Sequence, residues 1–303
     1  MPLQQLVEYF NDRLELEHQN SVRAFVLKKN QVYGLYGPLC ITSQLMPIRQ
    51  TQQPELIIGH HAQLTVAANQ AYPQLPAIVD SPDMNDQLSA SDQDSVINFD
   101  RLSRTVHMLN YLPQAHLDEL LFLEVDPRHI LGIKEDHGAY FEEIIHKCGL
   151  QTNSVVISLT VNDIYARLYP VLLKGLENYQ RRGYRLALKF HLSTLDKSAK
   201  DLITRVSPDY TGLLAQQIDQ SRDNNLLDKL QELCSLTASV QGKSIIFNAN
   251  DQSIAILAQQ IGFNFAQGDY YEQINNAKAA NLNHVNRPVS MVKKQLAQQG
   301  MTI

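Results

Sequence analysis

Residues 120–160 read LLFLEVDPRHILGIKEDHGAYFEEIIHKCGLQTNSVVISLT, and two kinds of hydrophobic pattern alternate within them. The runs 120–123 (LLFL) and 155–157 (VVI) are continuously apolar, as expected of strands that are covered on both faces. Between these runs, apolar side chains recur at helical spacing at Tyr140, Phe141, Ile144, Ile145 and Cys148. A buried strand, an amphipathic helix and a second buried strand predict a β–α–β unit with parallel strands.

The same alternation continues along the chain. Further amphipathic helices are predicted at 3–18, 102–109, from Asp163 onward, 197–205, 226–234 and 253–261, with a short C-terminal helix at 288–298. Further strands are predicted at 45–48, 56–66, 186–188, 210–215, 244–247 and 263–266, and a hairpin is predicted at 22–27 and 31–35. About six strand–helix units and the N-terminal strands favour an α/β, TIM-barrel-like (β/α)8 fold. No glycine-rich GxGxxG follows a strand, which disfavours a dinucleotide-binding fold.

The composition excludes several classes of protein. The 303 residues are 44% hydrophobic and 19% charged, which is too apolar for general disorder. The net charge of −5 argues against a nucleic-acid binder. No apolar run approaches the roughly 20 residues of a membrane span, and the N-terminus does not resemble a signal peptide, so we expect a cytoplasmic protein. The three cysteines, Cys40, Cys148 and Cys234, form no CxxC pair and predict neither a disulfide framework nor a zinc site.

Residues 80–95 differ from the rest of the chain, because they contain five aspartates and no lysine or arginine. They predict a solvated acidic loop. A calcium site is the alternative, but the spacing matches no calcium loop and the required glycine is missing.

Short motifs occur in a fixed order along residues 40–272. They are LMPI (45–48), IGHHAQL (58–64), LNYL (109–112), LFLEVDPR (121–128), DHG (136–138) with Phe141-Glu142, VVISLT (155–160), GYRLAL (183–188), SPDY (207–210), GKSII (242–246) and QG (267–268). Their order and spacing resemble the EAL family, the bacterial cyclic-di-GMP phosphodiesterases. The resemblance implies an EAL barrel over 37–277 that includes the acidic loop, an N-terminal helix and hairpin extension over 1–36 packed on the barrel, and a C-terminal helical tail over 278–303.

Members of the EAL family hold two divalent metals at their strand ends, and carboxylates are the ligands that such metals need. At the matching positions this chain has His61 for the Glu of EAL, Glu124 for the metal-binding Asn, Ser158 for the next Glu, Lys189 and Phe190 for the paired Asp, Gly212, to within one position, for the catalytic Lys, and Asn248 and Asp251 for the last two Glu. The phosphate-binding Arg is Thr65, and Gln267 alone is retained. The substitutions predict a degenerate domain with no metal, no cofactor and no phosphodiesterase activity.

Lys189 is the most informative substitution, because it places an ammonium where the family has a metal ligand. A buried lysine needs a counter-charge. We therefore hypothesise that Lys189 fills the vacated metal site and pairs with Glu124 or Asp251. The alternative is that its long side chain reaches solvent.

The remaining candidate residues have simpler interpretations. His60 and His61 are adjacent in a strand and point to opposite faces, so a structural or surface role is favoured over one metal site. His129, His137 and His146 lack ligand spacing. The Asp136-His137-Gly138 sequence is typical of a turn with a helix N-cap.

The resemblance leaves three functions open. The first is a catalytically inactive regulatory module that binds another protein in cyclic-di-GMP-related signalling, motility or biofilm control, and a homodimer is also compatible with it. The second is a receptor that binds cyclic-di-GMP without cleaving it, for which Asp209, Gln267 and Tyr270 would contribute to a base pocket. The third is an active cyclic-di-GMP phosphodiesterase with displaced ligands. Loss of the phosphate-binding Arg at Thr65 weighs against the second, and nothing indicates a nucleic acid or a membrane as a partner.

Overall fold

The computed structural model describes residues 2–18, 23–68, 93–133, 136–218 and 225–273. The predicted C-terminal tail and nearly all of the acidic loop lie outside these residues. The helix that follows the loop begins at Gln93, so the last three residues of the predicted loop are helical. Among the described residues, no helix is both long enough and apolar enough to cross a bilayer.

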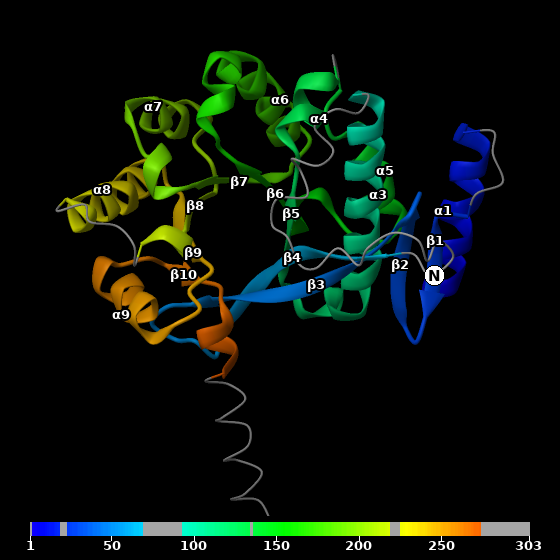
Figure 1. Ribbon diagram of the computed structural model, residues 1–303, viewed down its shortest axis with the longest axis horizontal. Coiled ribbons are helices and arrows are strands. Elements are labelled where there is room, and N and C mark those ends of the chain that lie inside the picture. Colours follow the sequence, from blue (N-terminus) through cyan, green and yellow to red (C-terminus); the bar gives the residue numbers. More distant parts are fainter. Residues whose placement is uncertain (1, 19–22, 69–92, 134–135, 219–224, 274–303) are drawn as a thin grey trace, which may run out of the picture.

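Eight strands form a closed barrel (Figure 1). They are β3 (Leu39–Gln50), β4 (Ile57–Ala68), β5 (Leu120–Glu124), β6 (Val155–Thr160), β7 (Arg185–Phe190), β8 (Tyr210–Leu214), β9 (Lys243–Phe247) and β10 (Phe265–Ala266). Strands β4 to β10 are parallel to their neighbours in chain order, and β3 closes the barrel by pairing antiparallel with both β4 and β10. The TIM-barrel-like prediction is confirmed.

Helices cover the outside of the barrel. They are α3 (Gln93–Tyr111), α4 (Pro127–Gly132), α5 (Ala139–Lys147), α6 (Tyr169–Arg181), α7 (Lys197–Val206), α8 (Leu226–Ser239) and α9 (Gln252–Ile261). The helix predicted from Asp163 begins only at Tyr169, after a 3-10 turn over Asp163–Leu168. Pro170 explains this start, since proline lacks an N–H and is favoured in the first helical turn, where that group has no partner.

The strands carry apolar side chains on both faces, as a sheet enclosed by helices requires. One cluster fills the barrel interior and includes Ile48, Phe122, Val156, Tyr210 and Ile245. A larger cluster lies between the strands and the helices. Three consecutive residues of β5, Leu121, Phe122 and Leu123, are fully buried because they alternate between these two clusters.

The N-terminal region adds an arm to the barrel, which we define as α1 (Leu3–His18), β1 (Phe25–Lys28), β2 (Gln31–Tyr36) and the outer parts of β3 and β4. The predicted hairpin is confirmed, and β2 pairs with the start of β3. Strand β4 pairs with β5 only up to His61, and then continues along β3 to Ala68. In Figure 1 the arm extends to one side of the barrel, where α3 lies between the two.

Candidate functional site

The carboxyl ends of the parallel strands meet at one rim of the barrel. We define the barrel mouth as the inward-facing residues His61, Glu124, Ser158, Lys189, Gly212 and Phe247. Strand register places Glu124 beside Ser158 and Lys189 beside Gly212. Because side chains alternate along a strand, Lys189 points into the barrel and its neighbour Phe190 points out into the surrounding core, where it is fully buried.

An ion pair occupies the barrel mouth. The Nζ of Lys189 lies 2.5 Å from Oε2 of Glu124, and the side chains are 6% and 36% exposed. Thr160 on β6 orients the carboxylate, since its hydroxyl donates to Oε1 of Glu124 over 2.6 Å. The hypothesis that the buried Lys189 pairs with a carboxylate is confirmed for Glu124. The alternative partner, Asp251, caps α9 by accepting from the Ile254 N–H over 3.0 Å.

His61 completes this group of polar residues. Its Nε2 lies 3.5 Å from the Lys189 ammonium and 4.0 Å from Oε2 of Glu124, and its ring packs on Phe247 with centroids 5.2 Å apart. An ammonium can only donate, so Nε2 accepts and the ring proton is on Nδ1. Burial lowers the pKa of His61 well below its usual value, and the positive charge of Lys189 lowers it further. His61 is therefore neutral at pH 7.

Gly212 leaves the space that Lys189 and Phe247 fill. A Cβ at Gly212 would lie 2.6 Å from the Phe247 ring and 3.0 Å from Cγ of Lys189. In the strand register Gly212 lies directly beside Lys189. Ser158 is fully buried, and its hydroxyl has no hydrogen-bond partner among the described residues.

Solved structures resemble this barrel although no protein-family model matches the chain and no curated protein matches its sequence. Klebsiella pneumoniae BlrP1 in complex with manganese and cyclic-di-GMP matches 77% of this chain at a TM-score of 0.60 and 16% identity. The EAL enzyme Bd1971, with cAMP and cyclic-di-GMP bound, matches 88% of this chain at a TM-score of 0.59 and 13% identity. Bacillus subtilis YkuI, which has an EAL domain and is in complex with cyclic-di-GMP and calcium, matches 84% at 0.60 and 15% identity.

The chain has the EAL-domain fold. It spans 55% of the BlrP1 chain, 65% of Bd1971 and 64% of YkuI, so each of those proteins contains more than the part matched here. At these identities the likeness concerns the fold alone. The predicted fold family is thereby confirmed, and the chemistry of this EAL fold has to be inferred from its own residues.

The donor set at the mouth of this EAL fold does not fit two divalent cations. Glu124 is the one carboxylate among the mouth residues defined above, and an ammonium already binds it. Within the described residues, no group of three or more His, Cys, Asp or Glu side chains could hold a metal ion. Hard cations require several anionic or carbonyl oxygens, so we derive no metal-dependent step at this site.

Asp209 lies apart from the other two residues predicted for a base pocket, Gln267 and Tyr270. Asp209 precedes β8 and so lies at the opposite end of the barrel from the mouth, where its carboxylate accepts from the Leu186 N–H over 2.9 Å. Gln267 is 2% exposed, and its side-chain carbonyl accepts from the backbone N–H of Asn248 over 3.3 Å. Tyr270 packs edge-on against Tyr271 with ring centroids 5.7 Å apart. The assignment of Asp209 to such a pocket is therefore wrong. Gln267 has a structural role that secures the turn after β9.

Two other positions of the family motifs also lie away from the mouth. Thr65 lies on the outer part of β4, opposite Thr42 and four residues beyond His61. His60 faces away from the barrel interior, and its Nδ1 lies 3.1 Å from Oε2 of Glu119. The opposite orientation of His60 and His61 is as predicted, but both are buried, so a surface role is wrong for either.

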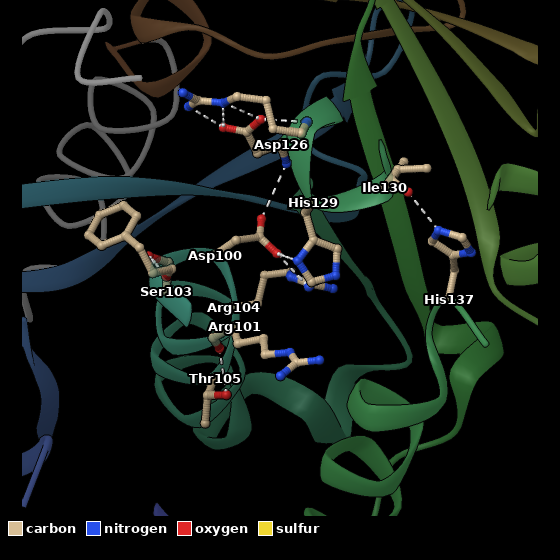
Figure 2. A network of polar contacts seen from close by, with 11 residues as sticks. Asp100, Arg101, Ser103, Arg104, Thr105, Asp126, His129, Ile130 and His137 are labelled. Carbon is tan, nitrogen blue, oxygen red and sulfur yellow. Dashed lines mark hydrogen bonds and ion pairs between the residues drawn. The ribbon is translucent and has the colours of Figure 1, made fainter. Parts of the chain in front are cut away.

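A second polar cluster lies outside the barrel between α3 and α4 (Figure 2). The Asp100 carboxylate is 2.5 Å from Nη2 of Arg104 and 3.0 Å from Nδ1 of His129, and it accepts from the Asp126 N–H over 3.2 Å. Asp100, Arg104 and His129 are all buried, and the Arg104 guanidinium lies 4.9 Å from the centre of the Phe141 ring. This cluster joins α3 to the start of α4. The sequence interpretation missed it, although the four-residue spacing of Asp100 and Arg104 is a signal for a pair on one helix face.

The DHG motif is also structural. Gly138, with φ of 87°, is the N-cap of α5, although it makes no side-chain cap, so the predicted turn with a helix N-cap is confirmed. Asp136 lies 3.1 Å from Arg182. His137 is buried, bonds the Ile130 carbonyl through Nε2 over 2.7 Å, and contacts Asn178 through Nδ1 over 3.1 Å. The motif thus ties α4 and α6 to the start of α5.

The buried histidines predict an acid-sensitive fold. Burial lowers the pKa of His107 from 6.5 to about 4, and burial together with Arg104 lowers that of His129 to about 2. Between these values and 6.5 the unfolded chain binds protons that the folded chain does not, so stability is lost as the pH falls through this window. We expect His107 alone to cost about 1.4 kcal/mol per pH unit there. Urea unfolding at several pH values would measure this slope.

A variant separates His107 from the other histidines. Its Nδ1 lies 2.7 Å from the Ser43 hydroxyl, and His107→Asn retains a polar partner for that hydroxyl without a titratable ring. We expect this variant to take up about one proton fewer on unfolding in this pH window, so that its free energy of unfolding depends less steeply on pH. An unchanged slope would show that His107 does not stay neutral in the folded protein.

Proposed function

We propose that this protein is a catalytically inactive EAL-fold regulatory protein that acts by binding another protein, in bacterial signalling related to cyclic-di-GMP and to motility or biofilm control. The Lys189–Glu124 ion pair in the barrel mouth carries this proposal. The sequence resemblance assigns both residues to positions at which the EAL family has metal ligands.

The electrostatics of the mouth support the absence of hydrolysis. A cation bound at Glu124 would lie close to the Lys189 ammonium. Two unit charges about 4 Å apart repel by about 4 kcal/mol at an effective dielectric of about 20, and a divalent cation doubles that cost. Gly212, the residue matched to the catalytic lysine, has no side chain that could replace it, and Phe247 and Lys189 fill the space beside it.

A strip of exposed apolar side chains supports the protein-binding role. Ile164, Leu168 and Val171 are 79%, 41% and 48% exposed at the junction of the 3-10 turn and α6. They lie within eight consecutive residues, so these exposed apolar side chains are concentrated in one short segment of the chain. A contiguous apolar patch on a protein surface is typical of a contact with another protein.

A cyclic-di-GMP receptor is the second candidate. It is supported by a structure of BlrP1 with FMN and cyclic-di-GMP and no metal ions, which matches this fold at a TM-score of 0.54 and 15% identity. Two observations argue against it, because the Lys189 ammonium is bound to Glu124 and the retained Gln267 is only 2% exposed. A ligand with two phosphates needs donors that are available to it.

Two measurements with cyclic-di-GMP test the proposal. We expect no hydrolysis in the presence of Mn²⁺ or Mg²⁺, and no heat of binding in titration calorimetry. Hydrolysis would refute the inactive assignment. Submicromolar binding without hydrolysis would replace the proposal with the receptor function.

The protein-binding part needs its own experiment. We expect an affinity pull-down to retain a protein that is lost when Ile164 and Val171 are both changed to serine. Leu227→Ser is the matched control, because Leu227 is 54% exposed but lies on α8. If the unmodified protein, the variant with serine at both Ile164 and Val171, and the Leu227→Ser variant all retain the partner equally, the strip is excluded as the contact surface.

A further inference from the structure

A small pocket lies outside the barrel where α1 and α3 meet the start of α5. Its volume is about 40 Å³, and its polar lining consists of Arg13, Asn98, Arg101, Thr105 and Tyr140. Leu14, Phe25 and Leu102 are among the apolar residues that form the rest of the wall. The pocket is separate from the barrel mouth and plays no part in the proposed function.

Two arginines from different helices meet at this pocket. The guanidinium carbon of Arg13 lies 4.7 Å from the centre of the Tyr140 ring, and that of Arg101 lies 4.5 Å from it. Contact with one aromatic ring holds both groups in place. Arg13 also pairs with Glu143 over 2.9 Å, and the side chain of that glutamate is 60% exposed.

Arg101 makes no close ion pair among the described residues, although its positive charge acts to lower the pKa of the Asp100 carboxyl. The part of the chain that the structure describes places no carboxylate within 4.0 Å of it. Its Nε is buried and has no hydrogen-bond acceptor there. The pocket does not reach this Nε, but the two terminal guanidinium nitrogens of Arg101 are not fully buried and make no hydrogen bond within the described residues, so they are the donors that a ligand in the pocket can contact.

We propose that this pocket binds an oxyanion, namely a phosphate or carboxylate group. The planar guanidinium fork of Arg101 suits two oxygens of such a group, whereas the charge of Arg13 is already balanced by Glu143. Asn98 lies one turn before Arg101 on α3 and offers a side-chain amide to the same pocket. A volume of about 40 Å³ corresponds to roughly three water molecules, which one oxyanion group would displace.

Thermal unfolding with added anions tests the proposal. At constant ionic strength, we expect inorganic phosphate, acetate or both to raise the Tm by about 2–4 °C in a saturable manner, relative to chloride. A saturable rise of the Tm with phosphate alone would assign a phosphoryl group as the ligand. A saturable rise with acetate would assign a carboxylate. We expect Arg101→Gln to abolish the rise and Arg205→Gln, an exposed arginine on α7, to retain it. An equal rise in all proteins, or none in the unmodified protein, would overturn the proposal.

A second variant keeps the test decisive if Arg101→Gln does not fold. Asn98→Asp places a carboxylate one turn from Arg101, and so supplies the anion within the chain. We expect this variant to unfold at a higher Tm in chloride and to lose its response to phosphate and acetate. An Asn98→Asp protein that still responds like the unmodified one would contradict the assignment of the pocket.

Discussion

Replacing Asp100 by alanine is expected to lower the free energy of unfolding by about 3–5 kcal/mol, the largest effect that we predict. The substitution removes the carboxylate that lies 2.5 Å from Arg104 and 3.0 Å from His129. Arg104 is 2% exposed, so its guanidinium would remain buried without a counter-charge. The Asp126 N–H at the start of α4 would lose its acceptor as well. Urea unfolding followed by circular dichroism measures the loss.

Two variants identify the cause of that loss. Asp100→Asn keeps the shape and an acceptor for the Asp126 N–H but removes the charge, and we expect an intermediate loss. Asp201→Ala breaks an ion pair of the same i, i+4 spacing to Arg205, but both side chains are more than half exposed. An exposed pair of this kind is worth about 0.5 kcal/mol or less. Equal losses for Asp100→Ala and Asp201→Ala would mean that burial of the cluster contributes nothing.

Removing Glu124 from the barrel mouth is expected to have the second largest effect. Glu124→Ala leaves the ammonium of Lys189, whose side chain is 6% exposed, among Phe247, His61 and the apolar interior. We expect a loss of about 2–4 kcal/mol, which is smaller than for Asp100 because Glu124 is 36% exposed and water can replace part of its contribution. Chemical denaturation again provides the measurement.

A double variant tests whether the unpaired charge of Lys189 causes this loss. We expect Lys189→Met combined with Glu124→Leu to be close to neutral or stabilising, because both charges are removed together. Thr160→Val is the matched control, since it removes only the hydrogen bond to Oε1 of Glu124. A double variant that is as unstable as Glu124→Ala alone would show that packing, and not charge, sets the stability of the mouth.

The barrel could be predicted because its strands are short and apolar on both faces, as in β5 and β6. Strand alternation also correctly predicted that His60 and His61 point in opposite directions. Helix starts were less accurate, because the apolar spacing from Asp163 is helical whether the turn is 3-10 or α, and only Pro170 marks the change. The sequence predicted that Lys189 pairs with Glu124 or Asp251. The sequence did not decide between them, because it did not show that Asp251 is the N-cap of α9.

The parts of the site that sequence reasoning missed depend on contacts between distant segments. His129 was judged by the spacing of metal ligands, whereas its role comes from Asp100, 29 residues earlier on another helix. Asp209 was grouped with Gln267 by motif, although its position before β8 places it at the amino end of a parallel strand. Strand direction would have separated the two residues without a structure.

Strands β3 and β4 pair with each other from the arm into the barrel, and their register shifts only between Ile48 and Arg49, beyond the arm. No hinge in the chain therefore separates the two parts along these strands. Deleting residues 1–36 would remove β2 from β3 and leave an open hydrogen-bonding edge at residues 39–41. Such an edge invites intermolecular strand pairing. A shortened protein made at the predicted boundary would consequently self-associate, and studies of the barrel have to use the full chain.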